Sequence, residues 1–164
     1  MSLHIQVKDL IQKPGTMKEL ELIHSLEYPL GTDVIAVPKG TELKLSVRLE
    51  SVHEGMLVTV SGLAVADTEC SRCLDPMHED IEIELQELFH YQPQEEDDFV
   101  IQQDRVDLEQ ALIDAVVPNL PIKPLCSEDC PGLCADCGEK LDVGTHIHEK
   151  PIDPRFDALK DFGS

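Results

Sequence analysis

The alternation of apolar and polar residues predicts three half-buried β-strands in the middle of the chain. In TELKLSVRL, residues 41–49, every second residue is apolar, so one face of the strand suits a core and the other suits solvent. The apolar positions are Leu43, Leu45, Val47 and Leu49, against Glu42, Lys44, Ser46 and Arg48. Segments 56–70 and 78–89 continue the pattern after short turns, which favours an antiparallel meander. Ser61-Gly62 indicates a β-bulge, because the apolar face changes sides there.

Helical spacing of apolar residues predicts one amphipathic helix after the meander. Residues 106–117, VDLEQALIDAVV, begin beside Asp107, a good capping residue, and are followed by Pro118. The apolar helix positions are Leu108, Leu112, Ala115 and Val116. Elsewhere in the chain, shorter strands are predicted at 34–40 and 3–7.

These elements predict an α+β fold: an antiparallel β-meander with one packed helix and a cysteine-rich metal-knuckle segment at the C-terminal end. We expect residues 1–125 to form the β-rich domain with its helix. Residues 126–164 would form the cysteine knuckle and a short terminal helix docked on the same domain. That terminal helix is predicted at 153–163, with Pro154 in its first turn. The proline-rich segment 119–126 would be a stiff connector.

The charge of the chain indicates what it binds. With 33 acidic and 13 basic residues the formal net charge is −20, which repels phosphate and attracts a basic partner. Direct contact with nucleic acid is therefore disfavoured, although scattered lysines leave it open. No Lys or Arg occurs between Cys73 and Asp104. Within that stretch, residues 91–98, YQPQEEDD, are typical of a solvated loop, with a docking surface for a basic partner as the alternative.

The amino terminus and the hydropathy of the chain predict its compartment. MSLHIQVKDL lacks a basic stretch followed by an apolar one, and no segment is long and apolar enough to span a membrane. We therefore expect a cytoplasmic protein without a membrane partner. In a reducing cytoplasm, the six cysteines favour metal binding over disulfides.

The cysteine spacing is that of a zinc site. Zinc is held by four soft or borderline ligands at tetrahedral corners, and a C-x-x-C turn points two thiolates at one ion. The candidate metal ligands are Cys70, Cys73, Cys126, Cys130, Cys134 and Cys137. Cys70 and Cys73 are best matched by Cys134 and Cys137, a second C-x-x-C turn closed by Gly138, with Cys126 and Cys130 as the rival pair. The sequence leaves this choice open.

Other chemistry of the cysteines is less favoured. His146 and His148 are candidates for a second site with the unused cysteines, although histidines in such a position are more often only solvated. Iron–sulfur ligation has overlapping spacings. A redox site would place C-x-x-C at a helix amino terminus, whereas Cys70 lies between two strands. No nucleophile, base and orienting group occur together, so we expect no enzyme, with a cysteine-based redox or metal-dependent enzyme as the alternative.

Several motifs together resemble a known family. They are CSRCL in a hairpin turn, an acidic strand ending ELF, LPIKPLC after a helix, CPGLCADCG followed by KLD, and a terminal DPRFDAL. Their order and spacing, from about residue 40 to the carboxyl end, resemble the YceD-like proteins, known as large ribosomal RNA subunit accumulation proteins. The six cysteines match the family's cysteine positions. Where some relatives carry further cysteines, this chain has His146 and His148.

The resemblance implies a role and leaves the mechanism open. It implies a non-enzymatic bacterial factor, with plastid relatives, that is needed for processing or accumulation of large-subunit ribosomal RNA. Combined with the charge, it favours a basic ribosomal protein or a large-subunit assembly intermediate as the partner, and it leaves direct contact with ribosomal RNA open although the charge disfavours it. Our hypothesis is that the acidic stretch from Asp75 to Asp104 shields such a partner from RNA until delivery.

Overall fold

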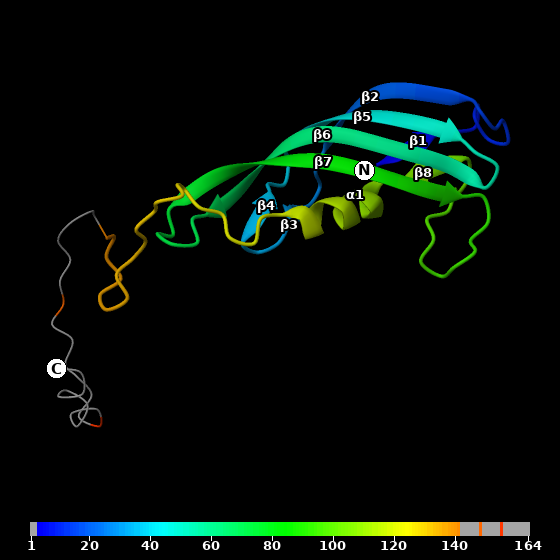
Figure 1. Cartoon of the computed structure of the whole chain (residues 1–164). Helices are drawn as coiled ribbons and strands as arrows, with labels where there is room; N and C mark the ends of the chain where they lie inside the picture. The colour runs from blue at the N-terminus through cyan, green and yellow to red at the C-terminus, as the bar shows by residue number, and fades with distance from the viewer. Residues whose placement is uncertain (1–2, 142–147, 149–154, 156–164) are drawn as a thin grey trace.

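A computed structural model describes residues 3–141, 148 and 155 (Figure 1). The described part is mostly antiparallel β-sheet, with one short α-helix and a cysteine cluster toward the C-terminal end. The strands are β1 (His4–Gln6), β2 (Met17–Ser25), β3 (Leu30–Gly31), β4 (Ile35–Val37), β5 (Glu42–Ser51), β6 (Gly55–Glu69), β7 (Pro76–His90) and β8 (Arg105–Asp107). They are followed by α1 (Glu109–Val116) and a 3₁₀ turn, η1 (Val117–Asn119).

The central sheet confirms the predicted meander. β5, β6 and β7 are antiparallel neighbours, β2 pairs with β5, and β3 and β4 extend the sheet beside the far end of β6. β6 and β7 pair without interruption from Gly55 opposite His90 to Glu69 opposite Pro76. This hairpin is the longest element of the fold and carries the first cysteine turn at its tip (Figure 1).

The predicted bulge at Ser61-Gly62 is wrong. Both registers of β6 run through these residues without a break, with Ser61 opposite Ser46 and Gly62 opposite Leu45. A side chain at Gly62 would lie 2.8 Å from the Leu45 side chain and from the Lys44 carbonyl oxygen, so glycine lets the two strands stay in register here. Because the alternation is never reset, Leu63 points to the outer face rather than into the core.

One face of the sheet is covered and forms the core. The inward side chains of β5, Leu43, Leu45, Val47 and Leu49, are fully buried, as the alternation predicted. Helix α1 packs over β7 and β3 and buries Ala111, Leu112 and Val116 in the same cluster. The two-stranded β1–β8 ribbon adds Ile5 and Val106.

The helix begins later than predicted. Residues 105–107 pair with β1, so Val106 belongs to a strand and α1 begins at Glu109. Asp107 still acts at the helix start, because its carboxylate accepts a hydrogen bond from the Glu109 N–H at 3.1 Å. Pro118 follows α1 within η1, and the predicted strands at 34–40 and 3–7 correspond to β4 and β1. The predicted terminal helix at 153–163 lies outside the described residues except for Arg155.

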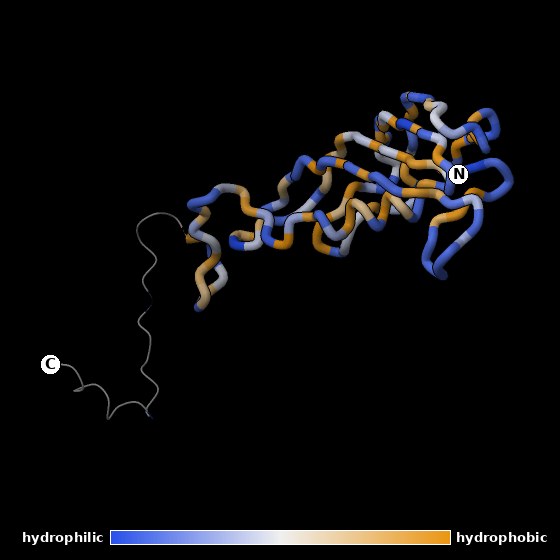
Figure 2. The backbone as a smooth tube through the Cα atoms, turned by 45° about the vertical axis from the view of Figure 1, so that its right-hand side comes forward, coloured by the Kyte–Doolittle hydropathy of each residue, from blue (hydrophilic) through white to orange (hydrophobic). Residues whose placement is uncertain are grey.

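The opposite face of β2, β5, β6 and β7 faces solvent, and we call it the open face. Its side chains alternate with the buried ones, so orange and blue follow each other along the tube in Figure 2. Four large apolar side chains lie on it, with exposed fractions of 48–69%: Met17, Ile23, Leu63 and Val65. The loop 91–98, predicted as solvated, is largely exposed. No helix in the described part is long and apolar enough to cross a membrane.

Candidate metal centre

The turn between β6 and β7 forms a tight cysteine knuckle. The Cys70 N–H donates to the Asp75 carbonyl at 2.8 Å, and the Leu74 N–H donates to the Cys70 carbonyl at 2.9 Å. Leu74 takes a positive φ of 59°, which lets the chain reverse within the turn. The knuckle therefore fixes the backbone of Cys70 and Cys73 in a closed loop.

The second pair of cysteines reaches this turn by way of the proline-rich connector. The Ser71 N–H donates to the Pro124 carbonyl at 2.9 Å, which fixes the chain just before Cys126. The Arg72 guanidinium donates to the carbonyls of Glu128 and Cys130, at 3.0 and 2.9 Å. The connector thus brings Cys126 and Cys130 against the tip of the β6–β7 hairpin.

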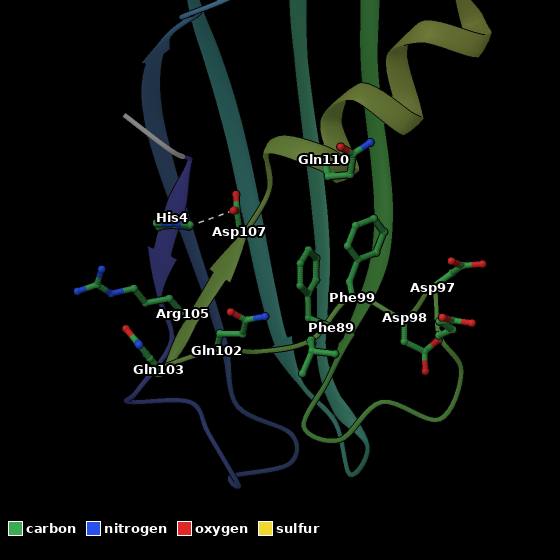
Figure 3. Close-up of a pocket in the computed structure, with 12 residues that line it drawn as sticks. His4, Phe89, Asp97, Asp98, Phe99, Gln102, Gln103, Arg105, Asp107 and Gln110 are labelled. Atoms are coloured by element: carbon green, nitrogen blue, oxygen red, sulfur yellow. Dashed lines mark ion pairs between the residues drawn. The ribbon is translucent and has the colours of Figure 1, made fainter.

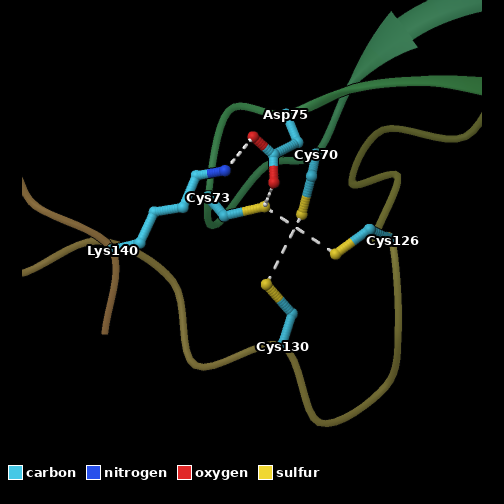
Figure 4. A network of polar contacts seen from close by, with 6 residues as sticks. All are labelled: Cys70, Cys73, Asp75, Cys126, Cys130 and Lys140. Carbon is cyan, nitrogen blue, oxygen red and sulfur yellow. Dashed lines mark hydrogen bonds and ion pairs between the residues drawn. The ribbon is translucent and has the colours of Figure 1, made fainter. Parts of the chain in front are cut away.

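Four sulfurs converge where these segments meet (Figure 4). The sulfurs of Cys70 and Cys130 are 3.8 Å apart, those of Cys73 and Cys126 are 3.7 Å apart, and all four lie within 4.8 Å of one another. A tetrahedral ion with metal–sulfur bonds of about 2.3 Å requires sulfur–sulfur edges of about 3.8 Å. None of the six cysteines forms a disulfide, so the spacing is that of metal ligands rather than of disulfides.

This grouping is the rival set of the sequence analysis. The preferred pairing of Cys70 and Cys73 with Cys134 and Cys137 is wrong, because Cys126 and Cys130 occupy that place. The spacing of three residues between Cys126 and Cys130 is compatible with the site because each approaches from a different side of the loop (Figure 4).

The environment of the four thiols favours a cation. Backbone N–H groups of Cys126, Cys73 and Arg72 donate to the Cys70 sulfur and lower its pKa to about 6. The Asp75 N–H acts in the same direction on Cys73, but burial and hydrogen bonds with neighbouring thiols outweigh it and raise the pKa of Cys73 to about 12. Four thiolates this close repel one another, so a divalent ion would supply the charge that lets all four ionise.

Two charged residues that the sequence analysis missed lie beside the cluster. Asp75 accepts a hydrogen bond from the Cys73 thiol at 3.5 Å and forms an ion pair with Lys140. The hydrogen bond from Lys140, followed by that from Cys73, holds the pKa of Asp75 below its usual range. Both residues could have been found from the sequence, because the motifs CSRCLD and CGEKLD place an acid and a lysine next to the cysteine turns.

A second group of ligands lies further along the chain. The sulfurs of Cys134 and Cys137 and a ring nitrogen of His148 lie within 4.8 Å of one another. His146, the other predicted histidine, lies outside the described residues. The structure therefore divides the six candidate cysteines into a group of four and a group of two, and both groups could hold a metal ion.

A cavity of about 460 Å³ lies at the opposite end of the sheet (Figure 3). The rings of Phe89 and Phe99, tilted by 32° with centroids 5.2 Å apart, form its apolar wall. His4 and Asp107 approach to 3.6 Å on one side, and Asp98 from the loop 91–98 lies on the other. The cavity is distant from the cysteines, so the two regions are separate features of the fold.

Comparison with known proteins identifies a family and several relatives that this chain resembles. Residues 58–163 match the family described as large ribosomal RNA subunit accumulation protein YceD. An uncharacterized protein of Mycobacterium tuberculosis is 41% identical over 165 residues, covering 94% of this chain and 78% of the relative. An uncharacterized protein of Mycobacterium leprae is 36% identical over 163 residues, covering 94% and 75%. No solved structure matches. The matched range includes all six cysteines.

Proposed function

The chain belongs to the YceD family of large ribosomal RNA subunit accumulation proteins, and from this membership we propose that it is a bacterial factor of large-subunit biogenesis that acts by binding, without catalysis. The family supports a role in accumulation of the large ribosomal subunit. Because bacterial ribosomes assemble in the cytoplasm, we propose that the protein acts there. The partner we propose is a basic ribosomal protein, free or within an assembly intermediate. The main observation that supports this proposal is the chemistry of the open face.

Carboxylates dominate the open face. Glu21, Ser46, Ser61 and Glu84 stand side by side across β2, β5, β6 and β7. In this row short serines lie between two acids. Further exposed carboxylates surround the row: Glu19, Glu42, Asp67, Asp80 and Glu82. Arg48, one of the few cations here, is paired with Glu50 at 2.7 Å. The face therefore attracts a cationic partner and repels a phosphate backbone.

The same face also offers apolar contacts. The next row places Ile23 beside Lys44, and Leu63 beside Glu82. Ile23 is 66% exposed and Leu63 is 69% exposed. A shallow groove of about 650 Å³ crosses both rows and is floored by Gly62 and the serines. A Lys- or Arg-rich segment with an interspersed apolar residue would fill the groove and pair with its acidic rim.

Zinc is the ion we propose for the four-thiol group. Four cysteine sulfurs at tetrahedral spacing form the ligand set of a closed structural zinc site. Cys70 is fully buried, and Cys73 and Cys130 are 8% and 5% exposed. Such a site would tie the C-terminal segment to the β6–β7 hairpin and contribute to folding free energy. In the alternative, a cysteine-based redox or metal-dependent enzyme, the burial of Cys70 argues against that residue as the reacting thiol, because substrate would have no access to its sulfur, whereas Cys126 and Cys137 are exposed.

A binding experiment with matched variants tests the proposal. Purified, untagged protein is titrated with individual large-subunit ribosomal proteins, and affinity is measured by fluorescence anisotropy at two salt concentrations. We expect at least one of them to bind in a salt-sensitive way. Glu82→Lys with Glu84→Lys should weaken binding at least about tenfold. The control, Glu95→Lys with Glu96→Lys, makes the same change of net charge in the exposed loop 91–98 and should retain binding.

A second pair of variants tests the apolar part of the contact. Leu63→Ser removes an exposed side chain from the open face, and Ile122→Ser removes one that is 92% exposed on the connector. Only the first should weaken binding. Equal loss in both charge variants, or tighter binding of large-subunit RNA than of any ribosomal protein, would overturn the assignment of the open face.

A further inference from the structure

The turn at Cys134 has the same backbone as the turn at Cys70. In the first, the Cys70 N–H donates to the Asp75 carbonyl at 2.8 Å and the Leu74 N–H donates to the Cys70 carbonyl at 2.9 Å. In the second, the Cys134 N–H donates to the Glu139 carbonyl at 2.7 Å and the Gly138 N–H donates to the Cys134 carbonyl at 2.8 Å. Chain reversal is thus achieved in the same way twice.

The contacts to sulfur are also the same. In each turn the first cysteine sulfur accepts from the backbone two residues ahead, from Arg72 at Cys70 and from Asp136 at Cys134, the latter at 3.4 Å. In each turn the second cysteine sulfur accepts from the backbone two residues ahead, from Asp75 at Cys73 and from Glu139 at Cys137. Backbone N–H groups aimed at sulfur stabilise thiolate ligands of a metal. The second turn is therefore built as a ligand-bearing knuckle.

A third ligand reaches this knuckle from further along the chain. A ring nitrogen of His148 lies within 4.8 Å of both sulfurs. The Leu133–Lys140 bridge closes the base of the loop, and the Leu133 N–H donates to the Arg72 carbonyl at 3.1 Å. The second knuckle is thus anchored on the first, while its ligands belong to a separate group. We propose that Cys134, Cys137 and His148 form a second zinc site, distinct from the four-thiol group.

The two sites differ in how they would hold the ion. Zinc takes four ligands in closed sites, and the described residues supply four in the first group and three in the second. In the second group Cys137 and His148 are exposed and Cys134 is half-buried. In the first group only Cys126 is exposed, whereas Cys70, Cys73 and Cys130 are buried. The second site has a fourth position for water or for a donor from a partner. It binds zinc more weakly and exchanges it faster than the first site.

Titration of the whole, metal-free chain with Co²⁺ tests the second site. Absorbance from thiolate-to-cobalt charge transfer scales with the number of thiolates per ion. We expect two phases, the first with four thiolates and the second with two, and two zinc ions per chain by elemental analysis after zinc loading. A chelator should remove the second ion first.

Single substitutions assign the phases. Cys134→Ser and His148→Ala should abolish the second phase, or weaken it by at least about tenfold, and leave the first unchanged. His53→Ala, an exposed histidine elsewhere in the chain, is the matched control and should show both phases. A single phase in the wild-type chain, or a second phase that survives both Cys134→Ser and His148→Ala, would overturn the proposal.

Discussion

Leu74 and Gly138 stand at the same position of the two cysteine knuckles and share a left-handed backbone, with φ of 59° and 75°. Each N–H donates to the carbonyl of the first cysteine of its turn, at 2.9 and 2.8 Å. Glycine adopts this φ without strain, whereas a leucine does so at a cost of about 1–2 kcal/mol. The first knuckle, which carries two sulfurs of the four-thiol group, thus contains strain that the second avoids.

Leu74→Gly should stabilise the protein. The substitution relieves the left-handed strain, and the leucine is 57% exposed, so little buried area is lost. After the greater freedom of glycine in the unfolded chain is subtracted, we expect the free energy of unfolding to rise by about 0.5–1 kcal/mol. Urea unfolding at saturating zinc measures it. Leu74→Ala is the control, since it shortens the side chain but keeps the strain. Equal effects of the two substitutions would show that strain is not the cause.

Gly62→Ala should destabilise the sheet. The added methyl would lie 2.8 Å from the Leu45 side chain and from the Lys44 carbonyl oxygen, so β5 and β6 would have to separate. Crowding of this kind costs about 1–3 kcal/mol. The neighbouring Ser61→Ala on the open face should stay within about 0.5 kcal/mol of the wild type. Urea unfolding compares the two, and similar values would indicate that the strands relax at this point.

The sequence predicted the meander well because each strand has one buried face. Alternation is strict in β5, and the structure buries the residues it singled out. The same reasoning failed at Leu63 and Val65, because it assumed that apolar residues must face inward, whereas the register keeps them on the open face. β2 was not predicted, since its apolar residues break alternation and are at most half-buried. Tertiary pairing with β5 determines that strand.

For the metal centre, the sequence identified the ligand types but not their grouping. Both Cys126 with Cys130 and Cys134 with Cys137 offer two thiolates at suitable spacing. The choice depends on a contact between distant residues, the hydrogen bond from the Ser71 N–H to the Pro124 carbonyl. That hydrogen bond holds Cys126 close to the hairpin tip. The spacing of cysteines along the sequence does not reveal such a contact, so the preferred pairing was wrong.

Asp98 should make stability depend on acid pH. Its carboxylate accepts hydrogen bonds from the N–H groups of Glu95 and Gln94, at 2.9 and 2.7 Å, and these contacts lower its pKa. A lowered folded-state pKa stabilises the protein fully above the unfolded value of about 3.9, and this contribution is lost as pH falls through the folded-state pKa. Urea midpoints between pH 6 and pH 3 measure the loss.

The loss should be smaller in Asp98→Asn, which keeps an acceptor but cannot titrate. Asp97→Asn removes the same charge from the same exposed loop and serves as the control. It should follow the wild-type curve. Identical acid profiles for all three proteins would show that the Asp98 hydrogen bonds do not contribute to stability.

Removing metal from the four-thiol group should free the C-terminal segment while the sheet survives. The core of β5 and central β6 is built from aliphatic side chains distant from the cysteines, whereas the segment after Cys126 is attached mainly through the hairpin tip. Zinc at 100 times its dissociation constant adds about 2.7 kcal/mol to the stability of the segment that it holds on the hairpin tip.

Hydrogen exchange with and without chelator should therefore show lost protection in residues 70–75 and 120–141, with protection in β5 retained. Cys130→Ser should show this pattern before chelation and little change after it, whereas Ser127→Ala should behave as the wild type. Loss of protection across the whole sheet would instead mean that the metal is needed to fold the core.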